Sequence, residues 1–368
     1  MTTTARARDL AIEFDGSTGT HNALTDVPGI EVGFATLIEG EGAHAVRTGV
    51  TAILPRGSDA VGDPCHAGMH SMNGNGEFTG SHWIAETGLL HLPIGITNSH
   101  AVGTVHRGII DWIVDKQLPT AKDWMLPCVG ETFDGDLNDI NGCHVTSDHV
   151  AAALNAARRG PVAEGNVGGG TGMNCYAFKG GTGTSSRVVA YGEQSFVVGA
   201  LVQANFGDRA ELTIRGVQVG KALPDDNPFA DQETRPPGGG SVIVIVATDA
   251  PLLPLQCQAL ARRVPLGLAR TGTTGSHFSG DIFLAFSTGN SGALHTGWEE
   301  RPPVGTLDAA AFVPWAHLDG LFAATVQAVE ESVINALVAA ETMVGRNGFR
   351  SPKLPLDRLQ HLMSAARH

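Results

Sequence analysis

Short apolar runs separated by polar or glycine-rich breaks divide the chain into several predicted strands. Runs rich in valine, isoleucine and leucine predict strands at 50–54, 92–97, 187–191, 196–204, 282–286 and from 242 onward. The pair Gly192-Glu193 between two of these runs is typical of a turn that joins paired strands. The β-branched run that begins at Val242 is unbroken, which favours a strand buried on both faces.

Three longer segments predict helices. The first begins near Thr146 or Ser147 and runs to Arg159, where Gly160-Pro161 stops it. The second spans 254–270. The third spans about 319–344, followed by Gly345, and we interpret its apolar stripe as core packing; the stripe consists of Phe322, Val326, Val329, Val333, Leu337 and Val344. Because strands and helices alternate poorly, we expect two sheets layered with helices rather than a doubly wound fold.

The segment 221–240 interrupts this pattern. It holds four prolines, several acidic residues and little apolar matter, which predicts an exposed, flexible linker. It leads through Gly238-Gly239-Gly240 into Ser241, the residue that opens the β-branched run. Ser241 therefore lies where a mobile segment meets a rigid strand.

This position gives Ser241 two interpretations. If the Gly240–Ser241 bond is cut, Ser241 becomes a chain terminus, so a weak hydroxyl nucleophile acquires a base in the same residue. The α-amine has a pKa of about 7.7–8.0, so part of it is neutral near pH 7. Taken alone, Gly-Gly-Gly-Ser before a strand is more often a plain loop, because serine commonly starts such elements.

Composition narrows the class of protein. The formal net charge of −13 over 368 residues and the lack of a basic patch argue against a nucleic-acid partner and weakly favour cationic ligands such as free amines. The 48 glycines cluster in short runs, among them 165–172 and 180–183, which we interpret as structural turns near a site. Five scattered cysteines, no visible signal peptide and no apolar run long enough to span a membrane predict a cytoplasmic protein with reduced thiols.

Two pairs of side chains and one side-chain amide are candidate catalytic or substrate-binding groups. Ser279 and Asp281 are two apart at the start of a predicted strand, so they share a face, where a hydroxyl and a carboxylate can orient an amine and relay a proton. Asn205 at the end of another strand could donate to an oxyanion. Glu131 and Phe133 also share a face, and a carboxylate beside an aromatic wall suits an ammonium group. Taken singly, each is explained as well or better by an ordinary turn.

A metal site is a remote alternative. His66 and His70 are four apart, which would place two ligands on one helical face. The segment is glycine-rich and has no HExxH pattern, so we expect no metal.

Seven segments taken together resemble the L-aminopeptidase/D-esterase (DmpA-like) family, which includes the β-peptidyl aminopeptidases. The similarity runs from about Arg6 to the last long helix. In chain order the segments are Arg8-Asp9-Leu10 with Phe14-Asp15-Gly16, Leu24-Thr25-Asp26-Val27-Pro28-Gly29, Asn73-Gly74-Asn75-Gly76-Glu77, Leu137-Asn138-Asp139-Ile140-Asn141-Gly142, the stretch from Glu164 to Met173, Gly240-Ser241, and Ala247-Thr248-Asp249-Ala250-Pro251-Leu252.

The resemblance implies a precursor that cuts itself at Gly240–Ser241. The products would be an α chain, 1–240, and a β chain, 241–368, within one catalytic domain that spans 1–368. It also implies an α+β fold built as a four-layer αββα sandwich, a homotetramer of αβ units, and no metal or other cofactor. The implied substrates are small peptides, amino-acid amides or esters with a free N-terminal amine, including D- or β-residues.

The resemblance also assigns roles to single residues. Ser241 matches the nucleophile, Ser279 and Asp281 match the partners of the new α-amine, and Asn205 matches the oxyanion donor. Glu131 matches the acid that binds the substrate's amino group. Some β-peptide-cleaving members carry Glu where this chain has Asp281, and Phe133 lacks the hydroxyl that a tyrosine would offer at its substrate-binding position. Both differences bear on substrate preference.

Two other functions stay open. An N-acetyltransferase of the ornithine acetyltransferase type shares the layered fold and self-cleavage, but it uses threonine, and Ser241 argues against it. A non-catalytic oligomeric ligand-binding protein would use Gly238-Gly239-Gly240-Ser241 as a mere loop.

Overall fold

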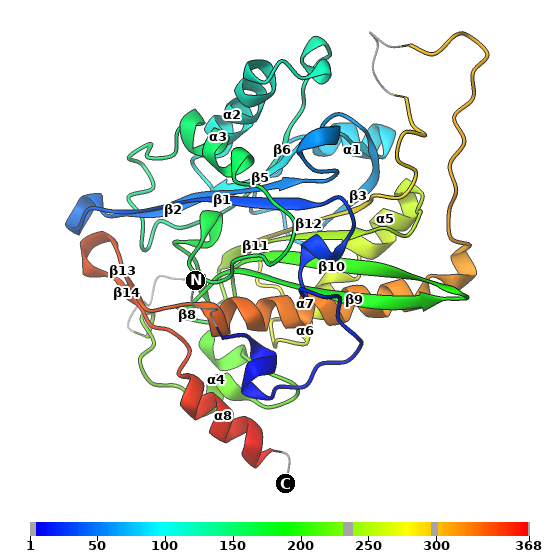
Figure 1. Ribbon diagram of the computed structural model, residues 1–368. Coiled ribbons are helices and arrows are strands. Elements are labelled where there is room, and N and C mark those ends of the chain that lie inside the picture. Colours follow the sequence, from blue (N-terminus) through cyan, green and yellow to red (C-terminus); the bar gives the residue numbers. More distant parts are fainter. Residues whose placement is uncertain (1–4, 231–237, 296–300, 367–368) are drawn as a thin grey trace.

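The structure is a computed structural model that describes residues 5–230, 238–295 and 301–366. Its centre is formed by two stacked β-sheets (Figure 1). In the smaller sheet β5 and β6 run parallel and the other neighbours antiparallel. Its strands, in spatial order, are β1 (Glu31–Glu39), β2 (Val46–Leu54), β5 (Ile94–Asn98) and β6 (Cys128–Thr132).

The larger sheet has six strands, of which the central pair β11 and β12 run parallel and the other neighbours antiparallel. Two short two-stranded sheets, β7–β8 and β13–β14, lie outside it. The six strands in order are β4 (Leu89–Leu90), β3 (Cys65–Ser71), β12 (Ser279–Ser287), β11 (Gly240–Thr248), β10 (Gln194–Asn205) and β9 (Gly181–Tyr191). The short strands are β7 (Asn174–Cys175), β8 (Phe178–Lys179), β13 (Met343–Val344) and β14 (Arg350–Ser351).

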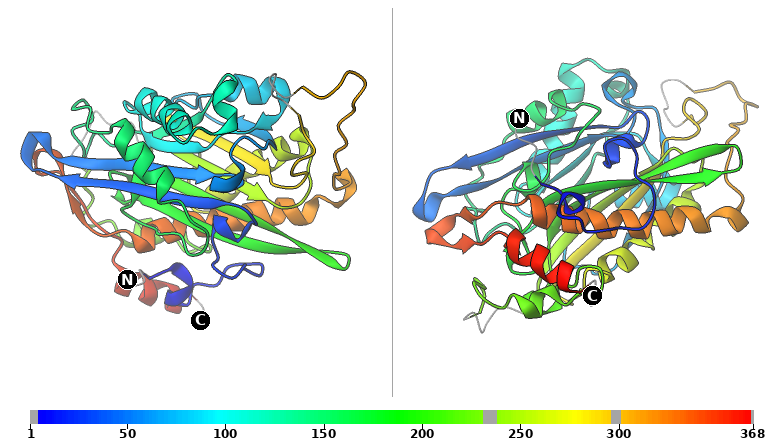
Figure 2. Two further views of the ribbon diagram at one scale, coloured as in Figure 1. Left: turned by 45° about the horizontal axis from the view of Figure 1, so that its top comes forward. Right: turned by 60° about the horizontal axis from the view of Figure 1, so that its bottom comes forward.

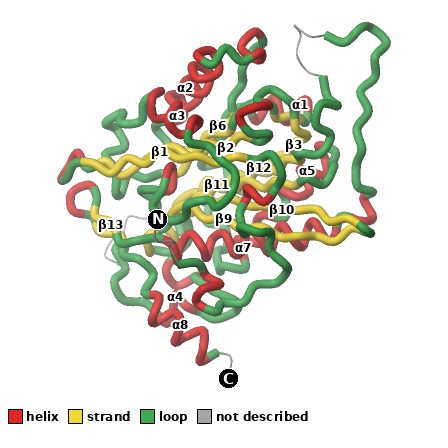
Figure 3. Tube along the Cα trace, viewed as in Figure 1, coloured by secondary structure: helices red, strands yellow, loops and turns green. Residues whose placement is uncertain are grey.

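Helices cover the outer faces of both sheets (Figures 2 and 3). Helices α2 and α3 pack on the smaller sheet, and α5, α6 and α7 pack on the larger one. The described helices are α1 (Ser81–Thr87), α2 (Val102–Asp115), α3 (Ser147–Asn155), α4 (Val219–Ala222), α5 (Pro254–Ala261), α6 (Val264–Ala269), α7 (Asp319–Ala339) and α8 (Leu356–Ala365). The order helix, sheet, sheet, helix is the αββα sandwich that was predicted.

Strand β11 shows why its sequence is apolar throughout. Val242 and Val244 pack against the helices on one face, whereas Ile243 and Ile245 pack between the two sheets. Because side chains alternate along a strand, a strand buried on both faces needs apolar residues at every position. The same alternation turns Ser241, at the start of the run, toward the smaller sheet.

The predicted helix 254–270 is wrong as a single element. It is divided into α5 and α6, with Arg262 and Arg263 between them. Pro265 lies in the first turn of α6, where its fixed φ and missing N–H are tolerated, whereas the interior of a continuous helix would not tolerate them.

Two other helices end earlier than predicted. Helix α3 stops at Asn155, because Arg158 and Val32 exchange backbone hydrogen bonds of 3.1 Å. Helix α7 stops at Ala339, because the side chain of Asn166 bonds both backbone groups of Glu341, at 2.8 and 3.2 Å. In each case a tertiary contact captures backbone groups that the helix would otherwise use.

Helix α7 is the one described helix with the length and hydropathy of a membrane span. However, 83% of its most apolar window is buried inside the protein. Its apolar residues pack in the core under the larger sheet, so packing accounts for its hydropathy, as predicted for Val329, Val333 and Leu337. Val344, the last residue of the predicted stripe, instead lies beyond α7 on β13 and is 51% exposed.

The first residues of the predicted linker 221–240 make contacts with the body of the protein. Lys221 belongs to α4, and the guanidinium of Arg209 donates to the carbonyl oxygens of Leu223 at 3.0 Å and Asp225 at 2.8 Å. The ring of Phe229 lies against that of Phe349, with centroids 5.4 Å apart. Residues 231–237 lie outside the described residues.

Candidate active site

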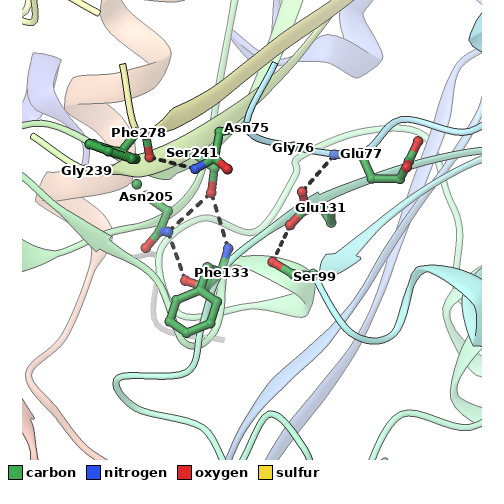
Figure 4. A pocket seen from close by; sticks show the side chains of 11 residues that line it. Asn75, Gly76, Glu77, Ser99, Glu131, Phe133, Asn205, Gly239, Ser241 and Phe278 are labelled. Carbon is green, nitrogen blue, oxygen red and sulfur yellow. Dashed lines mark hydrogen bonds between the residues drawn. The ribbon is translucent and has the colours of Figure 1, made fainter. Parts of the chain in front are cut away.

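A pocket of about 620 Å³ opens between the two sheets, at the start of β11 and the ends of β10 and β6 (Figure 4). Of the six residues predicted to be catalytic or to bind substrate, four line it, namely Ser241, Asn205, Glu131 and Phe133. The other lining residues are Asn75, Gly76, Glu77, Ser99, Gly239, Gly240 and Phe278.

Ser241 lies in this pocket with two hydrogen-bond donors directed at its hydroxyl. The side chain is 3% exposed. Its Oγ accepts the backbone N–H of Phe133 at 3.2 Å and the side-chain amide of Asn205 at 3.4 Å (Figure 4). Asn205 is the register partner of Ser241 across β10 and β11. The fold therefore brings two N–H donors to the atom predicted to be the nucleophile.

The orientation of the Asn205 amide is fixed by its other contacts. Its Oδ1 accepts the backbone N–H of Asn174 at 2.8 Å, and its Nδ2 also donates to the carbonyl oxygen of Phe133 at 2.9 Å. An oxygen that is held by a donor leaves the nitrogen as the atom that faces Ser241.

Glu131 forms a buried acidic wall of the pocket. Its side chain accepts the backbone N–H of Glu77 at 2.9 Å and the hydroxyl of Ser99. Burial raises the pKa of Glu131 above its usual value, and these two hydrogen bonds oppose the rise. Two donors leave part of the carboxylate's acceptor capacity unused, which suits an ammonium group in the pocket.

Ser279 and Asp281 form a hydrogen-bonded pair, but they do not line the pocket. Ser279 Oγ donates to Asp281 Oδ1 at 2.5 Å, and Asn73 Nδ2 donates to Asp281 Oδ2 at 3.0 Å. Burial raises the pKa of Asp281, and both hydrogen bonds oppose the rise. The shared face predicted for the pair is consistent with this contact.

The pair lies beside the backbone of the predicted cleavage point rather than beside the Ser241 hydroxyl. In the parallel register, Ser279 is the partner of Gly240, and Asp281 is the partner of Val242. By alternation the pair shares the face of Val242, whereas Ser241 points to the opposite face. In this uncut arrangement the pair can reach the main chain at the start of β11.

Three residues of the site carried no role in the sequence analysis. Ser99 follows β5, and the parallel pairing of β5 with β6 brings it to Glu131. Glu77 and Asn73 lie in the loop after β3, within one of the segments that carried the family resemblance. That loop packs on Gly280, where an added Cβ would lie 2.3 Å from the carbonyl oxygen of Asn75, so the glycine of Ser279-Gly280-Asp281 lets the loop close the pocket.

The two candidate metal ligands do not have the helical placement that their spacing required. His66 and His70 lie on β3, and the Nδ1 of His66 is 2.7 Å from the carbonyl oxygen of Leu252. The described residues contain no group of three or more His, Cys, Asp or Glu side chains that could hold a metal ion.

Comparison with known proteins gives matches over nearly the whole chain. The beta-peptidyl aminopeptidases BapA of Sphingosinicella microcystinivorans and Sphingosinicella xenopeptidilytica are both 46% identical to it. These alignments cover 98% of this chain and 92% and 91% of the two relatives.

Solved structures agree with these relatives. A beta-aminopeptidase of Burkholderia sp. superposes with a TM-score of 0.88 at 46% identity, over 98% of this chain and 99% of that one. The L-aminopeptidase D-Ala-esterase/amidase of Ochrobactrum anthropi, described as a prototype for the serine aminopeptidases and a variant of the Ntn hydrolase fold, gives 0.92 at 45% identity, with the same coverage. The predicted resemblance and sandwich are thereby confirmed. Because the profile of Peptidase family S58 also matches residues 22–351, this chain belongs to that family.

Proposed function

We propose that the protein is a self-processing serine aminopeptidase that also acts as an amidase and esterase. It would release the N-terminal residue from small peptides, amino-acid amides or esters through an acyl-enzyme on Ser241. The observation that carries this proposal is the convergence of two N–H donors on Ser241 Oγ in a pocket that Glu131 lines. A nucleophile, oxyanion donors and an ammonium-binding acid then face one substrate.

The first stage is scission of the chain itself. Ser241 Oγ loses its proton and attacks the carbonyl carbon of Gly240. The peptide C–N bond then breaks, the released nitrogen gains a proton, and an ester replaces the amide. Water hydrolyses the ester, which leaves a carboxylate on Gly240 and a free α-amine on Ser241. Ser279 is in register with Gly240 and is hydrogen-bonded to Asp281, and this pair would hold the amine.

The second stage is catalysis by the new terminus. The α-amine takes the proton of Oγ, directly or through Ser279, as Oγ attacks the substrate carbonyl carbon. The amide of Asn205 and the N–H of Phe133 would then hydrogen-bond the oxyanion. The leaving amine or alcohol takes a proton and departs, and water releases the acyl group. Because Glu131 would hold the substrate's ammonium group, cleavage would be limited to the first residue.

N-terminal sequencing and activity assays of purified protein test both stages. We expect two fragments, the second beginning at Ser241, together with hydrolysis of amino-acyl amides. Ser241→Ala should give one uncut, inactive chain, whereas Ser195→Ala, an exposed serine of β10, should be cut and active. A Ser241→Ala protein that still splits and still releases N-terminal residues would refute the proposal.

We also propose where the protein is located and how it assembles. A cytoplasmic location is supported by five free cysteines, of which Cys143 is exposed and the others are buried. A homotetramer of αβ units is supported by apolar side chains exposed in the segment before α7, which extends away from the body in Figure 1; they include Val304, Leu307, Phe312 and Trp315. Light scattering that gives a single-chain mass would contradict the tetramer.

A further inference from the structure

Lys179 is a fully buried lysine whose ammonium group the scheme above does not use. It lies on β8, and its Nζ donates to the carbonyl oxygens of Met173 at 2.8 Å, Gly180 at 2.9 Å and Gly170 at 3.4 Å. Among the described residues no carboxylate lies within ion-pair distance of Nζ. The buried Asp134 is the carboxylate whose charge acts on it from farther away.

Such a group is costly to bury, because an ammonium loses its hydration and gains only neutral partners. Three carbonyl acceptors match the three N–H donors of the protonated form. Burial lowers the pKa of Lys179 to about 7, so below that pH the lysine is a positive charge held in one place inside the protein. Its neighbours indicate what the charge acts on.

The carbonyl that Lys179 holds at 2.8 Å belongs to the peptide unit between Met173 and Asn174. The N–H at the other end of that same unit donates to Asn205 Oδ1, also at 2.8 Å. One peptide group therefore connects the buried ammonium to the amide predicted to hold the oxyanion. The amide of Asn205 in turn connects this peptide to Ser241.

We propose that Lys179 is a positioning residue for catalysis, which orients and polarises the Asn205 amide through the Met173–Asn174 peptide. A cation at the carbonyl end of a peptide strengthens its N–H as a donor, and hydrogen bonds in such a chain polarise one another. A stronger bond to Asn205 Oδ1 makes Nδ2 a better donor to a developing oxyanion. In the low dielectric of the interior such effects are weakly screened.

This inference rests on the proposed function. A double-mutant cycle tests it in such a way that a failure of the inference and a failure of the proposed function give different results. The four proteins are wild type, Lys179→Met, Asn205→Ala and the double variant. They are assayed on an amino-acyl anilide below pH 7, where Lys179 is protonated. Turnover is referred to the cut fraction measured on a denaturing gel, so a defect in scission is not counted as a defect in catalysis. Melting temperatures report whether each protein is folded.

We expect Lys179→Met to lower kcat about tenfold at unchanged KM, less than the 10²–10³-fold typical of removing an oxyanion donor itself. In the Asn205→Ala background the same change should lower kcat by less than about twofold, since the two residues act in one chain. Lys179→Arg, which keeps the charge, should recover part of kcat. A merely structural role would lower kcat equally in both backgrounds.

An equal loss in both backgrounds, or an unchanged kcat in Lys179→Met, would overturn the inference. If Lys179→Met does not fold, Lys179→Gln, which keeps an N–H donor without the charge, takes its place in the same cycle. A wild-type protein that is cut but does not hydrolyse the anilide would instead refute the proposed function.

Discussion

Asn174 holds the side-chain oxygen of Asn205 through its backbone N–H at 2.8 Å, so the Asn205 amide nitrogen faces Ser241 Oγ. This arrangement separates the two halves of one amide. The oxygen accepts a structural hydrogen bond, and the nitrogen is available for chemistry.

The first prediction uses that separation. Asn205→Asp keeps an acceptor for Asn174 and removes the donor to the oxyanion, so kcat should fall by about 10²–10³-fold. Asn155→Asp is the matched control, because Asn155 also accepts a hydrogen bond, from Trp112, and does not line the pocket. Steady-state kinetics of both variants test this prediction. Similar kcat values in the two variants would contradict the role of Asn205.

The second prediction concerns Glu131 and substrate affinity. Glu131→Gln removes the charge but keeps the shape of the side chain, so KM for a substrate with a free ammonium group should rise at least about tenfold. The effect should be small for the same substrate acetylated on nitrogen, if that compound is bound at all. An unchanged KM for the cationic substrate would remove the assigned role.

The third prediction is the pH dependence that Glu131 imposes. Burial raises its pKa above the usual 4.5, and an ammonium binds only to the ionised form. Activity at low substrate concentration should therefore fall as pH decreases through a midpoint above 4.5. The nearby charge of Glu77 contributes to the raised pKa, so Glu77→Gln should move this midpoint to lower pH. A pH profile of kcat/KM tests the shift, with the exposed Glu193→Gln as control.

The fourth prediction concerns Ser279 and Asp281, which share a hydrogen bond of 2.5 Å. If both act on the Ser241 amine, Ser279→Ala and Asp281→Asn should each lower kcat by about 10²–10⁴-fold. The kcat of the double variant should be only slightly lower than that of the less active single variant, because the effects of groups that act as a unit are not additive. Independent, multiplying losses would mean that the two residues have separate roles. Asp357→Asn, at the exposed start of α8, serves as control.

The fifth prediction is a stability effect of Lys179. Burial lowers its pKa from 10.5 to about 7. Between these values the unfolded chain binds a proton that the folded protein does not, so this residue makes stability rise with pH from about 7 upward. The melting temperature of wild type should therefore gain more between pH 7 and 8.5 than that of Lys179→Met. Equal gains would show that Lys179 keeps its ordinary pKa.

The order of the predicted elements indicated two sheets layered with helices, because strands and helices alternate poorly, and the family resemblance implied the αββα order. The β-branched run after Ser241 is buried on both sides, and the stripe of α7 packs in the core. Element ends were less predictable. Helix α7 ends where Asn166, far away in sequence, bonds Glu341, and no local signal at 339–344 announces that contact.

Contacts in the site were predictable from the sequence between residues of one strand. Contacts between residues that are far apart in the sequence were not. Ser279 and Asp281 contact each other because they are two apart on β12. The contact of Asn205 with Ser241 depends on the register of β10 against β11, which the sequence does not state. Lys179 has a weak signal in the sequence, because it is the one charged residue in the stretch 175–183.

The order of strands in the larger sheet has a consequence for the proposed scission. Strand β11 begins at residue 240 and β12 follows it in the sequence. In the sheet, however, both lie between β3 and β10, which precede residue 240. A cut before Ser241 would thus produce two polypeptides that are interwoven through one sheet. The two polypeptides could separate only if the strands at the centre of that sheet lost their hydrogen-bonded neighbours. The cut would therefore add two chain ends without producing a subunit that can dissociate.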